Sequence, residues 1–94
     1  MPRSWIGRIR EKVRLRQYDM TVHAVEEMAE DGLDIIDMEH AILTGRVVRT
    51  ERDDPRGNKY VIEGMTAVGV TRIGVVGRFT EGGRYLIITI YAIT

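Results

Sequence analysis

Two arginines and two tyrosines in the last third of the chain could bind a phosphate and move a proton. Alternation along a strand puts Arg72 and Arg78 on one face, separated by small residues. Guanidinium groups pair with phosphate oxygens, so this face predicts a shallow cationic surface. The strand that follows is expected to place Tyr85 and Tyr91 together on one face, where they could stack on bases or position a phosphate. Taken singly, each residue is more typical of surface charge or of a packed tyrosine with a solvated hydroxyl.

His23 stands one turn before Glu27 at the start of an expected acidic helix. A histidine and a glutamate four residues apart can reach one metal ion or one proton relay. A metal site needs a third and usually a fourth ligand, but His40 falls on another expected helix and the chain has no cysteine. We therefore predict no metal, and we favour a hydrogen bond from His23 to its helix cap or a neighbouring strand over catalysis.

The sequence lacks the motifs of several classes of enzyme and the segments that direct a protein into a membrane or out of the cell. No Ser-His-Asp arrangement, paired carboxylates or phosphate-binding glycine loop can be built, and we predict no cofactor. The absence of cysteine fits a reducing compartment. No run has the length of a membrane span or the form of a secretory signal, so we expect a cytoplasmic protein without a membrane partner.

The formal net charge is zero, but the charges are distributed unevenly along the chain. Residues 1–16 carry six Lys/Arg and one Glu, whereas residues 17–45 carry eight acids and no Lys or Arg. Residues 46–94 carry eight Lys/Arg and five acids. This pattern allows a basic and an acidic surface in one fold, or simply solvated faces of ordinary elements.

Apolar residues recur at helical spacing in the first half of the chain, and Thr21 and Asp34 are candidate N-caps. Asp37 can complete a capping box with Asp34. The expected helices are one over about 4–16, one from Thr21 to Gly32 and one from Asp34 to Gly45. The residues form a single domain over 1–94, divided into a basic amphipathic helix (1–17), two acidic helices (18–45) and a sheet (46–94).

From Arg46 the apolar period changes to two, and glycine and proline mark hairpin loops. Strands are expected at about 46–52, 59–64, 69–79 and 84–92, with loops over 53–58 and 81–83. The predicted fold is α+β, with three N-terminal helices on one face of a curved, four-stranded, mainly antiparallel sheet. The other face stays open, and the strand that begins at Arg46 is expected at an edge.

The order of segments TVHAVEEMAEDGLDIIDMEHAILTGRVV, YVIEG, TRIGVV and IITIY resembles the small bacterial proteins called domain of unknown function 4258, over about residues 18–92. The positions that carry the resemblance are Thr21, His23, Ala24, Met28, Gly32, Gly45, Gly64, Arg72, Thr89 and Tyr91. The chain departs from the pattern at Glu27 and Asp31, where the family usually has arginine.

This family is similar to the RelE-type and motility-quorum-sensing-regulator-type (MqsR-like) toxins. The resemblance implies an endoribonuclease, an mRNA interferase of a type II toxin–antitoxin pair, that cleaves RNA through the 2′-OH without metal. Arg72 and Arg78 would stabilise negative charge, and Tyr91, or less favourably His23, would move a proton. The implied RNA-binding residues are Arg46, Arg49, Lys59, Tyr60, Arg84 and Tyr85.

The resemblance also implies partners: an antitoxin of the small zinc-finger or helix-turn-helix type, and RNA with or without a ribosome. A homodimer is compatible with the sequence. The alternative is a noncatalytic protein- or RNA-binding module of the same fold, favoured by the neutral net charge and by Glu27 and Asp31.

Overall fold

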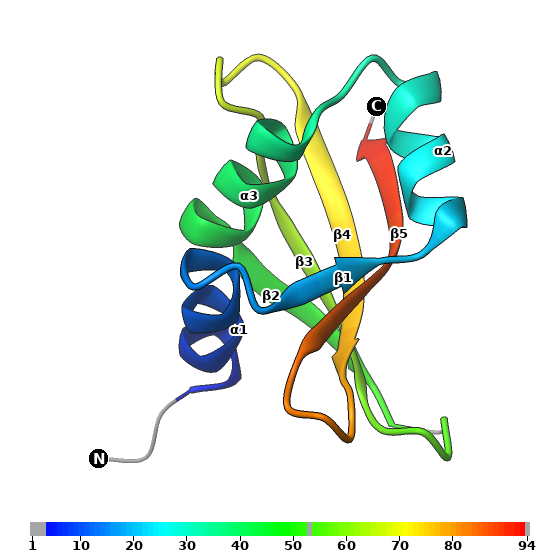
Figure 1. Cartoon of the computed structure of the whole chain (residues 1–94). Helices are drawn as coiled ribbons and strands as arrows, with labels where there is room; N and C mark the ends of the chain where they lie inside the picture. Colours follow the sequence, from blue (N-terminus) through cyan, green and yellow to red (C-terminus); the bar gives the residue numbers. More distant parts are fainter. Residues whose placement is uncertain (1–3, 53, 94) are drawn as a thin grey trace.

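The computed structural model describes residues 4–52 and 54–93, which form three helices and five strands (Figure 1). Residues 1–3 of the predicted basic segment, Asp53 of a predicted loop and Thr94 lie outside the described residues. In chain order the elements are α1 (Trp5–Arg14), β1 (Tyr18–Met20), α2 (Val22–Glu30), α3 (Ile35–Thr44), β2 (Arg46–Glu51), β3 (Lys59–Met65), β4 (Arg72–Phe79) and β5 (Tyr85–Ile93). None of the described helices has the length and apolar content that a bilayer-spanning helix requires.

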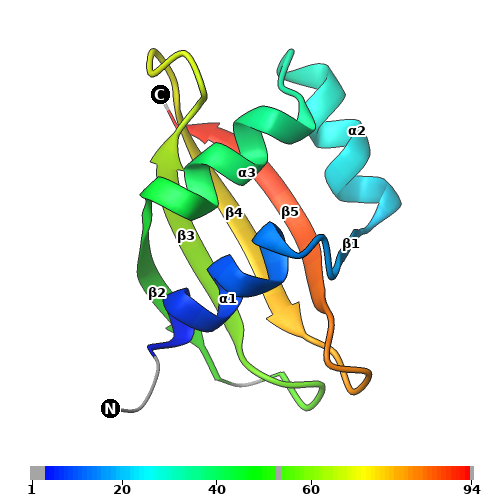
Figure 2. The same cartoon turned by 60° about the vertical axis from the view of Figure 1, so that its left-hand side comes forward.

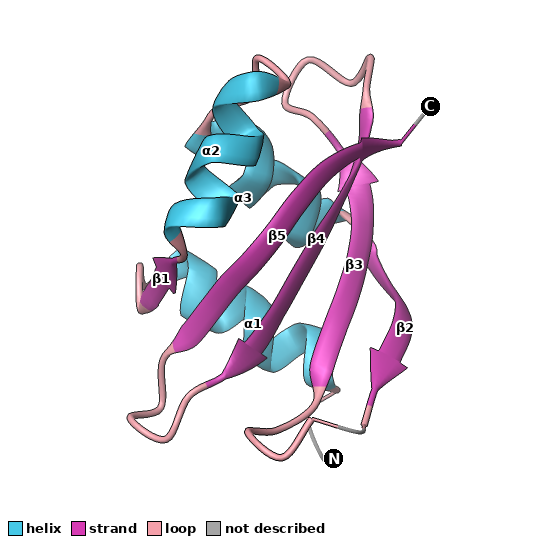
Figure 3. Cartoon of the chain, turned by 90° about the vertical axis from the view of Figure 1, so that its right-hand side faces the viewer, coloured by secondary structure: helices cyan, strands magenta, loops and turns pink. Residues whose placement is uncertain are grey.

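The strands form one sheet in the order β1–β5–β4–β3–β2, and the helices cover one of its faces (Figure 3). All neighbours are antiparallel except β1 and β5, which run parallel. The α+β class is confirmed, and β2 lies at an edge as predicted. The expected number of four strands was wrong, because β1 has only three residues. A segment so short, between two helices, cannot show the alternation on which strand prediction depends.

The second and third helices begin at the side chains predicted to cap them. Thr21 Oγ1 accepts a backbone N–H of α2 at 3.0 Å and donates to the Ile88 carbonyl of β5 at 2.9 Å. Asp34 and Asp37 form a reciprocal capping box at the start of α3. Gly32, just after α2, has a φ of 67°, a left-handed conformation that glycine adopts without strain. These signals are local in sequence, which explains why the helix boundaries could be predicted.

The hydrophobic core lies between the helices and the covered face of the sheet. Figure 2 shows α1 and α3 lying across the sheet, with α2 beside β5. Burial of apolar side chains in this layer is the main stabilising contribution to the fold. Its buried members include Ile9, Val13, Met38, Ile42, Ile62, Ile73, Val75, Ile87 and Ile90.

A β-bulge in β5 separates the two tyrosines that were expected on one face. Val76 of β4 pairs with Thr89 and the next residue pairs with Ile87, so Ile88 is an extra residue without a counterpart. Because side chains alternate along a strand, one extra residue moves everything beyond it to the opposite face. Tyr85 therefore lies in the core at 0% exposure, and the prediction of a shared face with Tyr91 was wrong.

Helix α3 meets the sheet through direct backbone contact. A Cβ atom built on Gly64 would lie 2.2 Å from the carbonyl oxygen of Ala41 in α3, and one built on Gly45 would lie 2.3 Å from the carbonyl oxygen of Glu63 in β3. Such distances are too short for any side chain, so both positions require glycine. Gly45, predicted only as a helix end, thus allows α3 and β3 to approach each other closely.

We predict that Gly64→Ala destabilises the protein by about 3 kcal/mol, because the backbone of α3 must move away from the sheet. The control is Gly82→Ala in the β4–β5 loop, where the nearest atom to an added Cβ lies 4.0 Å away. Urea unfolding of the two variants measures the difference. Equal free energies of unfolding for both would contradict the close contact.

Helix α2 covers the part of the β5 edge that β1 leaves unpaired. Glu27 Oε1 accepts the backbone N–H of Ile90 at 3.2 Å, and Asp31 Oδ2 accepts that of Ala92 at 3.3 Å. These are the two acids at which the sequence departs from the pattern that it resembles. An arginine has no acceptor, so it could not make either bond. The two acids therefore satisfy a strand edge that would otherwise be open to pairing with another chain.

We expect Glu27→Arg to lower the free energy of unfolding by about 1 to 2 kcal/mol, because the Ile90 N–H loses its partner. The matched control is Glu26→Arg, which makes the same change of charge on an exposed part of α2. Amide hydrogen exchange should accelerate at Ile90 in the first variant alone. If both variants exchange and unfold alike, the carboxylate of Glu27 does not hold the strand.

Candidate functional site

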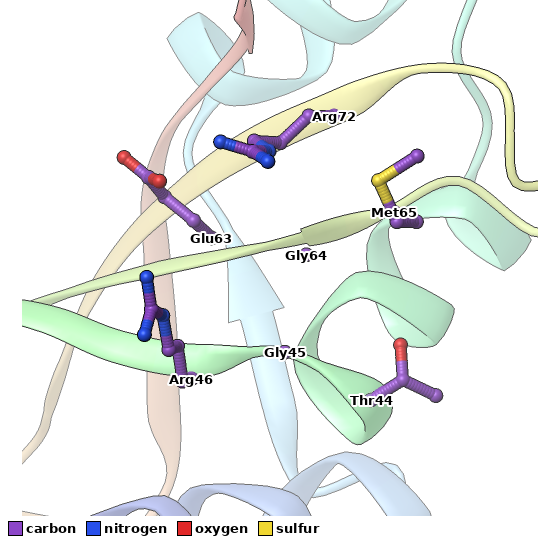
Figure 4. A pocket seen from close by; sticks show the side chains of 7 residues that line it. All are labelled: Thr44, Gly45, Arg46, Glu63, Gly64, Met65 and Arg72. Atoms are coloured by element: carbon purple, nitrogen blue, oxygen red, sulfur yellow. The ribbon is translucent and has the colours of Figure 1, made fainter.

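A hollow of about 350 Å³ opens where α3 ends, β2 begins, and β3 and β4 meet (Figure 4). We call it the arginine hollow, after Arg46 and Arg72. Its remaining lining residues are Thr44, Gly45, Glu63, Gly64 and Met65. Gly45 and Gly64 line it at the point where the backbone of α3 lies against β3.

The arginine hollow brings two guanidinium groups and one carboxylate together. Glu63 pairs with Arg46 across β2 and β3, and Arg72 opens the strand on the other side of β3. Figure 4 shows all three charged groups extending to the same side of the strands. Both arginines are exposed and Glu63 is half-buried. With the described residues, none of the three side chains forms a hydrogen bond or an ion pair, so all are available to a ligand.

Arg10 of α1 offsets partial negative charge that would otherwise repel an anion in the arginine hollow. The C-terminal end of a helix carries partial negative charge on its last carbonyl groups, and α3 ends beside the hollow. Arg10 donates from Nε to the Ile42 carbonyl at 3.2 Å and from Nη2 to the Gly45 carbonyl at 2.6 Å. Helix α3 has no basic residue in its own last turn. The cation supplied by α1 therefore offsets the negative end of α3.

Tyr91 lies on the open face of the sheet, in the same row as Glu63. The register aligns Glu63, Gly74 and Tyr91 across three neighbouring strands. The Tyr91 ring covers Gly74, where an added Cβ would lie 2.3 Å from ring atom Cζ. A phenol thus lies two strands away from the carboxylate, with β4 between them, on the same surface as the two arginines.

Among the predicted site residues, Arg46, Arg72 and Tyr91 are thus brought together. Arg78 lies at the other end of β4, opposite Leu86, in a separate shallow depression. Arg49 is engaged with Glu51 at 3.2 Å.

Three more of the predicted residues contact the β2–β3 loop or lie in the core. Lys59 Nζ lies 3.6 Å from Asp54 Oδ2. Tyr60 is only 2% exposed and packs against Trp5, with ring centroids 5.5 Å apart. The Tyr85 hydroxyl is buried without a hydrogen-bond partner among the described residues, and burial raises its pKa. Neither buried ring has exposed surface for stacking on a base.

Arg84 clamps β1 to β5. It donates from Nε to Asp19 Oδ2 at 2.7 Å and from Nη2 to the Tyr18 carbonyl at 3.1 Å. The hydrogen bond from Arg84 lowers the pKa of Asp19. The Tyr18 hydroxyl donates to Glu39, and burial together with this carboxylate raises the pKa of Tyr18. Arg84 therefore acts in the structure by holding the short edge strand.

His23 lies on the outer surface of α2. Its side chain is 67% exposed, and Nε2 lies 3.3 Å from Glu27 Oε1. The expected bond from His23 to a cap or strand is made by other residues: Thr21 caps the helix and Glu27 bonds the strand. Within residues 4–52 and 54–93, no three His, Cys, Asp or Glu side chains are grouped as a metal site.

Glu63 is the site residue that sequence reasoning missed. It lies in the YVIEG segment, which was used only as a mark of the family. Alternation along this strand already puts Glu63 on the face opposite Ile62, and an acid in an otherwise apolar strand is the available signal. What the sequence could not supply was the register that places Arg46 beside it.

A family model for a domain of unknown function (DUF4258) matches residues 20–92. The chain belongs to this family. Helix α1, with Arg10 and Trp5, precedes the residues that the DUF4258 model matches. Neither the curated proteins nor the solved structures contain a match to the chain. Membership therefore assigns residues 20–92, from the end of β1 into β5, to one family and leaves the chemistry to be inferred from the site.

The pKa of Asp54 offers a test of the loop that engages Lys59. Hydrogen bonds from the Arg56 side chain and backbone lower this pKa to about 2, and Lys59 contributes a smaller attraction. A lowered carboxyl pKa stabilises the fold above the unfolded value of about 4, and the contribution is lost as the pH falls through about 2. We predict a carbon-detected titration midpoint near that lower value, which Arg56→Gln moves upward. Arg14→Gln is the control, and a wild-type midpoint near the ordinary value would contradict the contact.

Proposed function

We propose that the protein is a metal-independent endoribonuclease whose active site is the arginine hollow with Tyr91. One observation carries the proposal: the side chains of Arg46, Glu63 and Arg72 meet at one opening and have no partner among the described residues. Two cations around a carboxylate, with a phenol in the same row of the sheet, provide the groups that RNA cleavage through the 2′-OH needs.

The chemistry divides among these residues as follows. Glu63 accepts the proton of the ribose 2′-OH while the 2′-oxygen attacks the adjacent phosphorus. Arg46 and Arg72 hold the phosphate and stabilise the negative charge that develops on its oxygens. The bond from phosphorus to the 5′-oxygen breaks, and Tyr91 gives that oxygen a proton. The products are a 2′,3′-cyclic phosphate and a free 5′-OH. Arg78 and His23 lie away from this arrangement, and we give them no role.

The proposal extends to a biological setting, a cytoplasmic toxin of the RelE or MqsR kind held inactive by an antitoxin. The order of a basic helix, two further helices and a mainly antiparallel sheet supports this likeness. A partner that covers the open face of the sheet would block the arginine hollow directly.

A noncatalytic binding module is the second candidate, and the β2 edge favours it. Helix α2 and β1 cover the opposite edge of the sheet, whereas β2 pairs only with β3 among the described strands. An open edge can bind an extended segment of a partner through backbone hydrogen bonds. Such a module could bind RNA or protein at the same face without cleaving it.

Cleavage of a single-stranded RNA separates the two candidates. We expect Glu63→Gln to slow cleavage by about 10² to 10⁴, as loss of a general base does, and Arg72→Gln by about 10² to 10³. The matched controls are Glu26→Gln and Arg14→Gln, which neutralise exposed charges away from the hollow. Replacing the scissile 2′-OH by hydrogen should abolish cleavage and leave binding intact.

Two results would overturn this proposal. If the 2′-deoxy substrate is cut, the attacking group is not the 2′-OH. If intact RNA binds without being cut and Glu63→Gln binds equally well, the module is the correct function.

A further inference from the structure

A second hollow, of about 370 Å³, lies at the opposite end of β3 and is walled by aromatic rings. We call it the aromatic hollow. Trp5 and Arg8 of α1 form one side, and Tyr60 and Phe79 of the sheet form its base. Gly57 and Asn58 of the β2–β3 loop complete the lining.

The aromatic hollow exposes part of the Trp5 ring and the guanidinium group of Arg8, above the buried Tyr60. The Arg8 guanidinium lies over the Trp5 ring at 4.7 Å and over the Phe79 ring at 4.9 Å. Trp5 is 48% exposed, although large aromatic side chains are usually mostly buried. Arg8 has no hydrogen bond or ion pair with the described residues, so its donors face outward unpaired. A bound group would thus meet an indole, a guanidinium plane and a positive charge.

The two hollows lie at the two ends of the same strands. The six residues of β2 extend about 20 Å, from Arg46 at the arginine hollow toward the β2–β3 loop that lines the aromatic hollow. Figure 2 shows the course of β2 from the end of α3 toward that loop. Exposed Arg52 follows the end of β2 on this side. Tyr60 faces the helices, whereas Glu63, three residues further along β3, faces the open side of the sheet, so the two hollows lie on opposite faces. One flexible polyanion of several units can reach both by passing round the β2 edge, whereas a mononucleotide or dinucleotide cannot.

We propose that the aromatic hollow is a stacking subsite for an unpaired base of the same RNA strand whose phosphate enters the arginine hollow. This inference rests on the proposed function and names its substrate class as single-stranded RNA. Unpaired bases stack on aromatic rings and on arginine planes, while bases in a duplex already stack on each other. Because Trp5 and Arg8 precede the residues that the family model matches, α1 adds this subsite to the family domain.

The test uses the only tryptophan of the chain as its reporter. The probe is a 2′-O-methyl octaadenylate with a terminal fluorescein, which cannot be cleaved through its 2′ position. Binding is measured by fluorescein anisotropy, and contact at the aromatic hollow by tryptophan emission with the same oligonucleotide lacking the dye. We expect saturable quenching of Trp5 by the octamer and none by a duplex of the same length.

Three variants separate stacking from charge and from folding. Trp5→Leu should bind the octamer about five- to 150-fold more weakly, as loss of one stacked base predicts. Trp5→Phe should stay close to wild type, because it keeps a ring. Arg8→Gln should weaken binding more than Arg14→Gln, which removes an exposed charge elsewhere on α1. Circular dichroism melting of each variant identifies any loss of fold.

The outcomes also separate this inference from the proposed function. Equal affinity of wild type, Trp5→Phe and Trp5→Leu, or tryptophan emission unchanged at saturation, overturns the stacking subsite even if the protein cleaves RNA. Saturable quenching in the wild type together with weaker octamer binding by Trp5→Leu, in a protein that cuts no RNA, supports the subsite and rejects the nuclease.

Discussion

The fold depends on one backbone contact, in which the last turn of α3 lies against β3 without any side chain between them. The Ala41 carbonyl oxygen occupies the space where Gly45 and Gly64 would otherwise carry a Cβ. This contact sets where β2 begins and therefore where Arg46 meets Glu63. Arg10 binds carbonyl groups of the same turn, so the position of α1 follows from it as well. The same backbone contact therefore determines both the packing of the helices and the position of the arginine hollow.

Some of the unevenly distributed charges of the sequence make contacts within the fold. In the basic first helix, Arg10 binds carbonyl groups of α3 and Arg8 lies over two aromatic rings. In the acidic second helix, Glu27 and Asp31 bind backbone N–H groups of β5. A net charge near zero therefore does not describe the surface that a ligand meets. The unpartnered arginines of the arginine hollow are brought together by strand register rather than by their density in the sequence.

A structural feature could be predicted from the sequence when the residues that determine it are close together in the chain, and could not when they are far apart. The capping residues Thr21 and Asp34 are local signals, and the helices follow from them. The bulge at Ile88 depends on what β4 offers opposite, so period-two counting put Tyr85 on the wrong face. Glu63 is unremarkable in sequence, because its neighbours Arg46 and Arg72 reach it only through pairing on both sides of β3.

The tyrosines of β5 and the glycines of β4 form two matched pairs on opposite faces of the sheet. Tyr91 covers Gly74 on the open face, and Tyr85 covers Gly77 in the core. A Cβ atom at either glycine would overlap the tyrosine ring. Neither residue of a pair can therefore change in size unless the other changes too. In relatives, a residue larger than glycine at the β4 position requires a residue smaller than tyrosine at the β5 position. Sequence covariation across these pairs would then record the bulge that lies between them.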